Sequence, residues 1–395
     1  MPFQLRLRSG WCVLVPALML CCWATLLPAE EPTPRTRRSG SQSGDRMSLS
    51  ERAALGALDW LARHQAPDGS WSIEGFSRQC KGEKCSGPGE TPADTAATAL
   101  GVLPFLAAGQ THTGKGPYQK TVYRSLYYLM AQQKEDGNLG GDCRQPMYAH
   151  GMATIALANA HAMADRRDPV LGKHVQRAVN FIESAQNRQT GGWRYFPGDE
   201  GDTSVLAWQI VALKSAEKAG LKVDPKTYDG ARKWLKTVAA GEHGGRFRYL
   251  PTLPPKPSMT AAGLLSSELL GMKRDDPAIA EGTAYLLENL PSKETRDCYY
   301  WHDATQAMHL LRDERWDRWN RAIRRTLIET QVKEGCAAGS WDPDKPTKDA
   351  WGQQGGRLMV TSLSCLCLEV YYRYLPIFKF DKPEEPPAPK SSGGQ

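Results

Sequence analysis

The stretch that decides the fold runs from Gln186 to Leu213 and reads QNRQTGGWRYFPGDEGDTSVLAWQIVAL. It begins where an amphipathic helix ends and passes through a Gly-Gly-Trp loop. It then continues from Asp202 into a second helix that is far more apolar. The same helix, glycine–aromatic loop and helix return along the chain. Because one such unit cannot bury its apolar face alone, the recurrence predicts a repeat architecture in which neighbouring units stack.

Six such helix pairs fit between residues 49 and 376. Four consecutive loop landmarks are each 54 residues apart: Leu139, Trp193, Phe247 and Trp301. The first helix of each pair is amphipathic and the second is apolar nearly all round, so we expect an outer ring facing solvent and a buried inner ring. An open solenoid needs polar capping repeats, yet the last helix is strongly apolar. The sequence therefore predicts an all-α fold, a closed α/α toroid of six helix pairs.

The two ends of the chain have a different composition from this repeat region. Residues 1–29 have the pattern of a signal peptide or a membrane anchor, with basic residues before an apolar run over residues 11–27. That run is about 17 residues long, near the lower limit for crossing a bilayer. Residues 30–48 predict a disordered linker and residues 377–395 a disordered Pro-rich tail. We expect an exported protein, periplasmic or extracellular, or one anchored through residues 11–27.

Composition limits the classes of partner. The chain is 41% hydrophobic and 24% charged, which suits a soluble core, and its net charge is +7. Much of that excess lies near the N-terminus, and no basic stripe with interleaved aromatic residues follows, so we expect no nucleic-acid partner. The chain contains no Gly-rich phosphate loop, nucleophile elbow or HExxH motif. We therefore expect no cofactor, and protein partners stay open.

The cysteines agree only loosely with export. Without the three in residues 1–29, seven remain, an odd number. Cys80 and Cys85 lie in a loop rich in Gly and Lys, where they are candidates for a small disulfide or for free thiols. Their C-x4-C spacing has no second pair at zinc-finger spacing, so we expect no metal there.

Four of the loops share a Gln that precedes a glycine-containing turn, in three cases with a Trp. The motifs are Gln65…Asp68-Gly69-Ser70-Trp71, Gln132/Gln133…Asp136-Gly137, Gln186…Gly191-Gly192-Trp193 and Gln331…Gly339-Ser340-Trp341. They resemble the Gln–Trp repeats of prenyltransferase/squalene oxidase repeat proteins, the superfamily of squalene-hopene cyclases and protein prenyltransferase β subunits. The resemblance spans about residues 50–375. It implies a terpenoid cyclase-like α/α toroid in which the Gln and Trp side chains tie loops to neighbouring helices.

The resemblance also implies where a cyclase acid would lie. Squalene-hopene-type cyclases protonate an alkene with the middle Asp of a D-x-D-D-T-A motif. The stretch over residues 91–96 has Ala93 in the place of that Asp, and the stretch over residues 199–204 has Gly201 there. The known proton donor is therefore unmatched. Three aspartates stand at the expected start of the second, apolar helix of a pair: Asp94, Asp202 and Asp303. A carboxylate at this position typically caps free N–H groups, which is a structural role.

The zinc site of protein prenyltransferases is unmatched as well. That site takes an Asp and a Cys two residues apart and a His at the start of the last inner helix. Here Asp297 and Cys298 are adjacent, His302 and Asp303 lie nearby, and the last inner helix carries no His. We therefore expect no metal ion at this position.

These observations lead to two hypotheses on function. The first is an exported toroid that lacks the known catalytic motifs and binds an apolar, isoprenoid-like or glycan ligand, or acts as a scaffold. Trp193, Tyr195 and Trp208 are its candidate ligand-binding residues, since aromatic side chains stack on sugars and isoprenoids. The alternative is a divergent enzyme, a terpenoid cyclase (an isomerase) or a carbohydrate-active enzyme, with Asp199 and Asp202 as catalytic carboxylates.

Overall fold

A computed structural model of the protein describes residues 47–164, 168–370 and 375–376. The predicted signal peptide or anchor of residues 1–29, nearly all of the predicted linker and the predicted tail of residues 377–395 lie outside the described residues. Within the described part of the chain, no helix is both long enough and apolar enough to cross a membrane.

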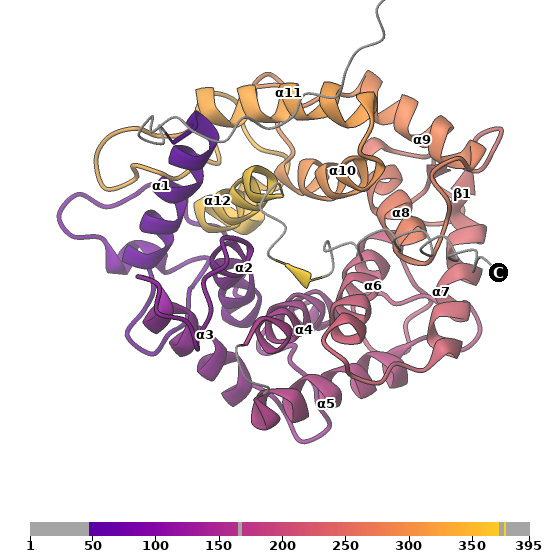
Figure 1. Cartoon of the computed structure of the whole chain (residues 1–395), viewed down its shortest axis with the longest axis horizontal. Coiled ribbons are helices and arrows are strands. Elements are labelled where there is room, and N and C mark those ends of the chain that lie inside the picture. The colour runs from indigo at the N-terminus through magenta and orange to yellow at the C-terminus, as the bar shows by residue number, and fades with distance from the viewer. Residues whose placement is uncertain (1–46, 165–167, 371–374, 377–395) are drawn as a thin grey trace, which may run out of the picture. The chain divides into compact units, whose positions relative to one another are not determined.

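Six amphipathic helices form the outer ring of the compact unit that starts at Met47 (Figure 1). They are α1 (Leu49–Arg63), α3 (Gln119–Ala131), α5 (Pro169–Ala185), α7 (Pro225–Val238), α9 (Pro277–Glu288) and α11 (Glu314–Thr330). Most begin at a side chain that accepts a backbone N–H, as at Ser48, whose capping box with Glu51 starts α1. An Asp-Pro pair begins α5, α7 and α9, with the Asp as cap and the Pro in the first turn.

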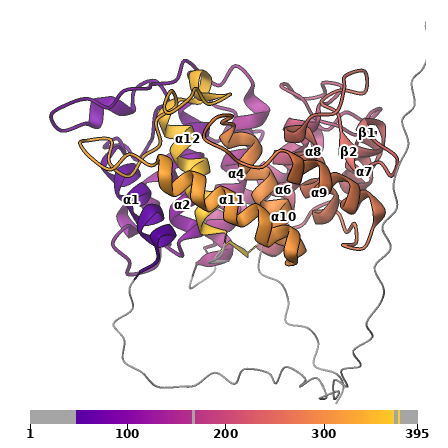
Figure 2. The ribbon, with the colours of Figure 1, turned by 90° about the horizontal axis from the view of Figure 1, so that it is seen from above.

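The other six helices form an inner ring and are buried on nearly every side. They are α2 (Asp94–Ala107), α4 (Pro146–Met163), α6 (Thr203–Lys218), α8 (Pro257–Leu269), α10 (Cys298–Leu311) and α12 (Gly352–Glu369). A short 3-10 helix, η1 (Phe76–Gln79), precedes α2, and a two-stranded ribbon of β1 (Ala239–Ala240) and β2 (Arg246–Phe247) precedes α8. Figure 2 shows the long loops that enter the inner helices gathered at one end of the ring.

The ring is closed. Each inner helix packs on the inner helices before and after it, and α12 packs back on α2. The outer helix α1 contacts α11 and α12, so the first and last pairs meet along one seam. The predicted all-α toroid of six helix pairs is confirmed for the described residues.

In four of the six units, the glutamine of the repeat motif binds its loop to the next outer helix. The Gln186 amide donates to Gly191 O, in its own loop, at 2.8 Å and to Thr227 O, in α7, at 2.9 Å. Gln65 and Gln133 make the same pair of bonds in their units. At the seam, the Gln331 amide donates to Gly339 O at 2.9 Å and to Ala53 O of α1 at 2.7 Å. One repeated hydrogen-bond pattern therefore also closes the ring.

The loop tryptophans have an equally structural role. The indole N–H of Trp71, Trp193 and Trp341 each donates to a carbonyl of the preceding outer helix at 2.8–2.9 Å. All three side chains are at most 1% exposed. This satisfies the only polar atom of a large buried side chain. The Gln–Trp motifs therefore have a structural role, which is to hold the loops against the outer helices.

The fifth helix pair differs from the sequence-based expectation. Helix α10 begins at Cys298 because the Asp297 side chain accepts the Tyr300 N–H at 2.9 Å. Trp301 therefore lies inside the helix and not in a loop. The expected cap Asp303 lies in the middle of α10, where it pairs with His302. Among the other expected caps, Asp202 does cap α6, whereas Asp94 is the first residue of α2 and forms no side-chain cap.

Candidate functional site

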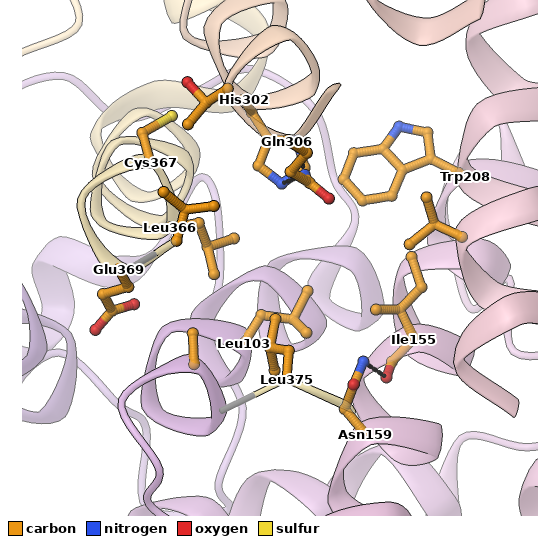
Figure 3. A pocket seen from close by; sticks show the side chains of 14 residues that line it. Leu103, Ile155, Asn159, Trp208, His302, Gln306, Leu366, Cys367, Glu369 and Leu375 are labelled. Carbon is orange, nitrogen blue, oxygen red and sulfur yellow. Dashed lines mark hydrogen bonds between the residues drawn. The ribbon is translucent and has the colours of Figure 1, made fainter. Parts of the chain in front are cut away.

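A cavity lies inside the inner ring and is the candidate functional site (Figure 3). Its volume is about 50 Å³, room for about three or four water molecules. Five inner helices and Leu375 contribute its walls. Most of the lining is apolar: Leu103, Ala107, Ile155, Trp208, Val211, Leu366, Cys367, Val370 and Leu375. The polar lining residues are Asn159, His302, Thr305, Gln306 and Glu369.

One side of the cavity is a fixed polar and aromatic wall. The His302 ring stacks on Trp208, with ring centroids 5.6 Å apart and an interplanar angle of 13°. His302 Nδ1 lies 2.9 Å from Asp303 Oδ1, and its Nε2 lies 2.7 Å from the Gln306 amide nitrogen. These distances fit an imidazole whose Nδ1–H donates to Asp303 and whose Nε2 accepts from the Gln306 amide. The Trp208 indole donates to the Tyr299 hydroxyl at 2.6 Å. This wall has little freedom to rearrange.

The opposite side of the cavity carries polar atoms without partners. Glu369, at the end of α12, is 2% exposed, and neither carboxyl oxygen has a hydrogen-bond partner in the described residues apart from the nearby Cys365 thiol. Burial raises the pKa of Glu369 well above its ordinary value, which keeps the carboxyl protonated. The side-chain oxygen of Asn159 on α4 is also buried without a partner. A buried polar atom left unpaired costs about 1–3 kcal/mol, so such a pair in one cavity favours a bound polar group.

A second polar cluster surrounds Asp202 at the loop end of the ring. Asp202 Oδ1 accepts the Val205 N–H and the Ser204 hydroxyl, both at 2.8 Å. Its Oδ2 accepts the Tyr249 hydroxyl at 3.2 Å and lies 3.8 Å from Arg194 Nε. Burial raises the pKa of Asp202, and these bonds oppose the shift. Both oxygens are thus occupied by donors of the protein itself, as in a helix cap.

The predicted site residues separate into different places. Asp199 accepts the Phe196 N–H within its own turn at 3.0 Å, and no hydrogen bond or ion pair of the described residues joins it to Asp202. Tyr195 lies beside Asp202 through its bond to the Tyr249 hydroxyl at 2.6 Å. Trp208 lines the cavity. Trp193 is 1% exposed and is not among the residues that line the cavity; its indole N–H donates to Ile182 O of α5.

Gly201 shows why no acid stands where a cyclase has its proton donor. Its φ is +119°, a backbone conformation that other residues rarely adopt. A Cβ atom there would lie 2.9 Å from the Gly192 Cα and 3.1 Å from the Trp234 ring. Gly192 and Trp234 therefore occupy the space that a side chain at residue 201 would need, and an aspartate does not fit there.

Of the two states that the sequence leaves open for Cys80 and Cys85, a small disulfide or free thiols, the structure has free thiols. Cys80 and Cys85, like the other cysteines of the described residues, are free. Their sulfur atoms face His64 and Cys336, and these four residues form the one group within the described part of the chain whose His, Cys, Asp or Glu atoms converge as metal ligands would. The prenyltransferase-like residues do not converge in this way. Asp297 caps α10, and the Cys298 thiol points to Asp349 Oδ1 at 3.5 Å.

Sequence reasoning missed the cavity residues Asn159, Gln306 and Glu369. One signal for Glu369 was present, since it is the only acidic residue in the apolar run LMVTSLSCLCLEVYY. A charged side chain is rarely buried without a partner, so an isolated Glu in a helix expected to be internal deserves a functional hypothesis. Asn159 and Gln306 carried no comparable signal.

Comparison with known proteins places the chain by fold. No family model and no curated protein sequence matches it. Among solved structures, the type II terpene cyclase MstE from Scytonema is similar, with a TM-score of 0.50 and 14% identity over 83% of this chain and 99% of that one. An inactive α-1,6-mannanase variant from Salegentibacter sp. HEL1_6 has a TM-score of 0.56 and 9% identity over 84% of this chain and 100% of that one. A wild-type glycosidase has a TM-score of 0.51 and 10% identity over 83% and 98% of the two chains.

These similarities establish the fold class. The protein is an α/α toroid of the kind seen in a terpenoid cyclase and in glycosidases, as the Gln–Trp motifs predict. At such low identity the similarity concerns the backbone, and the same fold supports unrelated chemistries. Its function has to be argued from the cavity.

Proposed function

We propose that the toroid binds a small, mainly apolar molecule that carries one hydroxyl or similar group. The observation that supports this most directly is the pair of unpartnered polar groups, Glu369 and Asn159, in an otherwise apolar cavity. A protonated carboxyl both donates and accepts, and the Asn159 oxygen accepts, so either group can pair with a ligand hydroxyl. The flat Trp208–His302 wall suits the apolar body of the ligand. An isoprenoid alcohol has this chemistry.

A glycan ligand fits the cavity less well. A sugar exposes several hydroxyl groups, each of which needs a partner when buried. The other polar side chains of the cavity are engaged already, because His302 and Gln306 bond each other and the Thr305 hydroxyl accepts the Trp319 indole N–H at 2.9 Å. The lining thus offers too few free polar atoms for a sugar.

The test is direct binding of two probes of contrasting chemistry. Prenol, a five-carbon isoprenoid alcohol, and glucose are titrated into the purified protein by calorimetry and by ligand-observed NMR. We expect prenol to bind, and Glu369→Leu and Trp208→Ala each to weaken binding about tenfold, the loss of one hydrogen bond or one aromatic contact. Tyr127→Ala removes an exposed aromatic residue of the outer ring and serves as the control. Binding of glucose alone would replace this proposal by the glycan hypothesis, and binding of neither would favour a scaffold.

The enzymatic alternative rests on Asp202. Its buried, protonation-prone carboxyl touches Tyr249, and an acid of this kind can donate a proton. A glycosidase needs a second carboxylate across the scissile bond, and Asp199 is engaged in its own turn. We therefore expect no release of reducing sugar from an α-1,6-mannan and no cyclisation of geranylgeranyl substrates. Activity that disappears in Asp202→Asn would establish the enzymatic alternative.

We also propose that the protein acts outside the cytoplasm, exported or anchored through residues 11–27. Basic residues followed by an apolar run support this. Fractionation of cells that express the full chain, together with N-terminal sequencing of the product, tests it. Recovery of the intact chain with the cytoplasmic proteins would contradict the proposal.

A further inference from the structure

The four residues His64, Cys80, Cys85 and Cys336 meet at the seam where the toroid closes. His64 directly follows α1, Cys80 follows η1, and Cys85 lies in the loop before α2. Cys336 comes from the loop between α11 and α12, 272 positions after His64. Ring closure alone brings the first and last helix pairs close enough for these side chains to meet.

The distances match a tetrahedral zinc centre. His64 Nε2 lies 3.3 Å from the Cys80 sulfur, 3.5 Å from the Cys85 sulfur and 3.7 Å from the Cys336 sulfur. With Zn–N and Zn–S bonds of about 2.0 and 2.3 Å, ligand atoms on a tetrahedron are about 3.5–3.8 Å apart. All four ligand atoms lie within 4.8 Å of one another, so small side-chain rotations complete the cage.

The surroundings orient the imidazole for this role. His64 Nδ1 lies 2.7 Å from Trp60 O, a hydrogen bond that places the ring proton on Nδ1 and leaves the Nε2 lone pair facing the sulfurs. The ring stacks on Trp60 at 4.3 Å and is only 1% exposed. The Cys85 N–H donates to the Cys80 sulfur at 3.3 Å, a contact that favours a thiolate. Metal-binding histidines have this outer hydrogen bond as a rule.

The loop that carries Cys85 is held by a buried cation. Arg357, on α12, is 1% exposed, and its guanidinium donates to Ser86 O at 2.7 Å and to the Ser86 hydroxyl at 2.9 Å. A zinc ion with three thiolates and one neutral imidazole has a net charge of −1. The guanidinium also pairs with the Asp342 carboxylate at 2.6 Å, so its main contribution is to hold the loop beside the ligand Cys85 in place.

We propose that His64, Cys80, Cys85 and Cys336 bind one structural Zn²⁺ ion, which joins the loop before α2 to the loop before α12 across the seam of the ring. Three thiolates select a soft or borderline metal, and a complete set of four protein ligands leaves no position for a substrate. The zinc centre is separate from the cavity and does not depend on the proposed ligand.

The experiment is metal analysis of the full chain purified under reducing conditions. The protein is loaded with Zn²⁺, dialysed and measured by inductively coupled plasma mass spectrometry. We expect one zinc per chain for the wild type and for the control Cys143→Ser, a half-buried cysteine outside the cluster. We expect less than a tenth of that for Cys336→Ser. Less than a tenth of an equivalent in the wild type, or full occupancy in Cys336→Ser, would overturn the proposal.

A second measurement on the wild-type chain does not depend on the folding of a variant. Alkylation followed by peptide mass spectrometry reports which thiols react. Zinc is expected to slow the alkylation of Cys80, Cys85 and Cys336 more than tenfold, and a strong chelator is expected to reverse this, while Cys143 reacts equally in both states. A Cys80–Cys85 disulfide in the zinc-loaded reduced protein, or unchanged alkylation rates, would refute the zinc centre.

Discussion

The buried carboxyl of Glu369 gives the sharpest prediction, a stability that falls as pH rises. The folded protein raises the pKa of this group well above 4.5, its ordinary value, because the carboxylate would lose its hydration and only the Cys365 thiol would offset that loss. The unfolded chain ionises near 4.5. Between the two pKa values the native state holds more protons than the unfolded state, so the free energy of unfolding decreases by about 1.4 kcal/mol for each pH unit. Below pH 4.5 the effect vanishes, since both states are protonated.

Glu369→Gln isolates this effect, because the amide has a similar shape and no ionisation. The difference in unfolding free energy between variant and wild type is expected to be smallest near pH 4.5 and to grow by up to about 1.4 kcal/mol per unit above it. Urea unfolding followed by circular dichroism at pH 4.5, 5.5 and 6.5 measures it. Glu329→Gln removes an exposed carboxyl from α11 and is the control. A difference that is the same at all three pH values would show that Glu369 is ionised in the folded protein and would refute the argument.

Three further predictions concern the wall of the toroid. Burial lowers the pKa of His150 to about 4, so the free energy of unfolding should fall by at most about 3 kcal/mol as pH falls from 6.5 towards 4. His150 accepts the Leu139 N–H, as the Thr98 hydroxyl accepts the Trp71 N–H in the first unit. His150→Thr keeps an acceptor there without a titrating group and should flatten the pH profile in urea titrations. Gly201→Asp should cost about 3 kcal/mol in thermal unfolding, whereas Gly198→Asp, whose Cβ meets nothing within 4 Å, should cost about 1 kcal/mol; equal losses would contradict the packing argument. Gln331→Ala removes the hydrogen bond to Ala53 O across the seam and the bond to Gly339 O within its own loop, and it should cost about 2–3 kcal/mol; a loss below 0.5 kcal/mol would show that this side chain does not stabilise the closed ring.

The fold could be predicted because the repeat motif marks the hydrogen bonds that join the loops to the outer helices. Gln186 and Trp193 form bonds that recur in other units, so several copies report the same geometry. The pattern failed where a unit is irregular. Trp301 matched the 54-residue spacing by coincidence, because α10 begins earlier, at Cys298, and takes the landmark into the helix. A constant spacing identifies a repeat more reliably than it identifies the boundaries of each element.

The candidate sites could not be predicted in the same way, because their residues occur in single units and form no pattern that recurs along the sequence. Glu369 and Asn159 come from α12 and α4, and they line one cavity only because the ring is closed. The cysteine spacing of Cys80 and Cys85 was visible, but the remaining ligands, His64 and Cys336, lie at opposite ends of the repeat array. Local spacing rules detect metal sites built within one loop, and this cluster is built across the seam.

The division between wall and cavity also explains why the motif resemblance carries so little information about chemistry. The Gln and Trp side chains of the repeat bond backbone carbonyls of the outer helices, and none of them lines the cavity. Those bonds depend on the backbone of the outer helices, and the inner helices meet the loop tryptophans at only a few positions, such as Thr98 and Gly101 beside Trp71. In the proposed binding function, the ligand is selected by the few side chains that line the cavity, such as Glu369, and these can change without altering the loop bonds. A cyclase, a glycosidase and a binding protein can therefore share this ring, and only the polar groups inside it distinguish them.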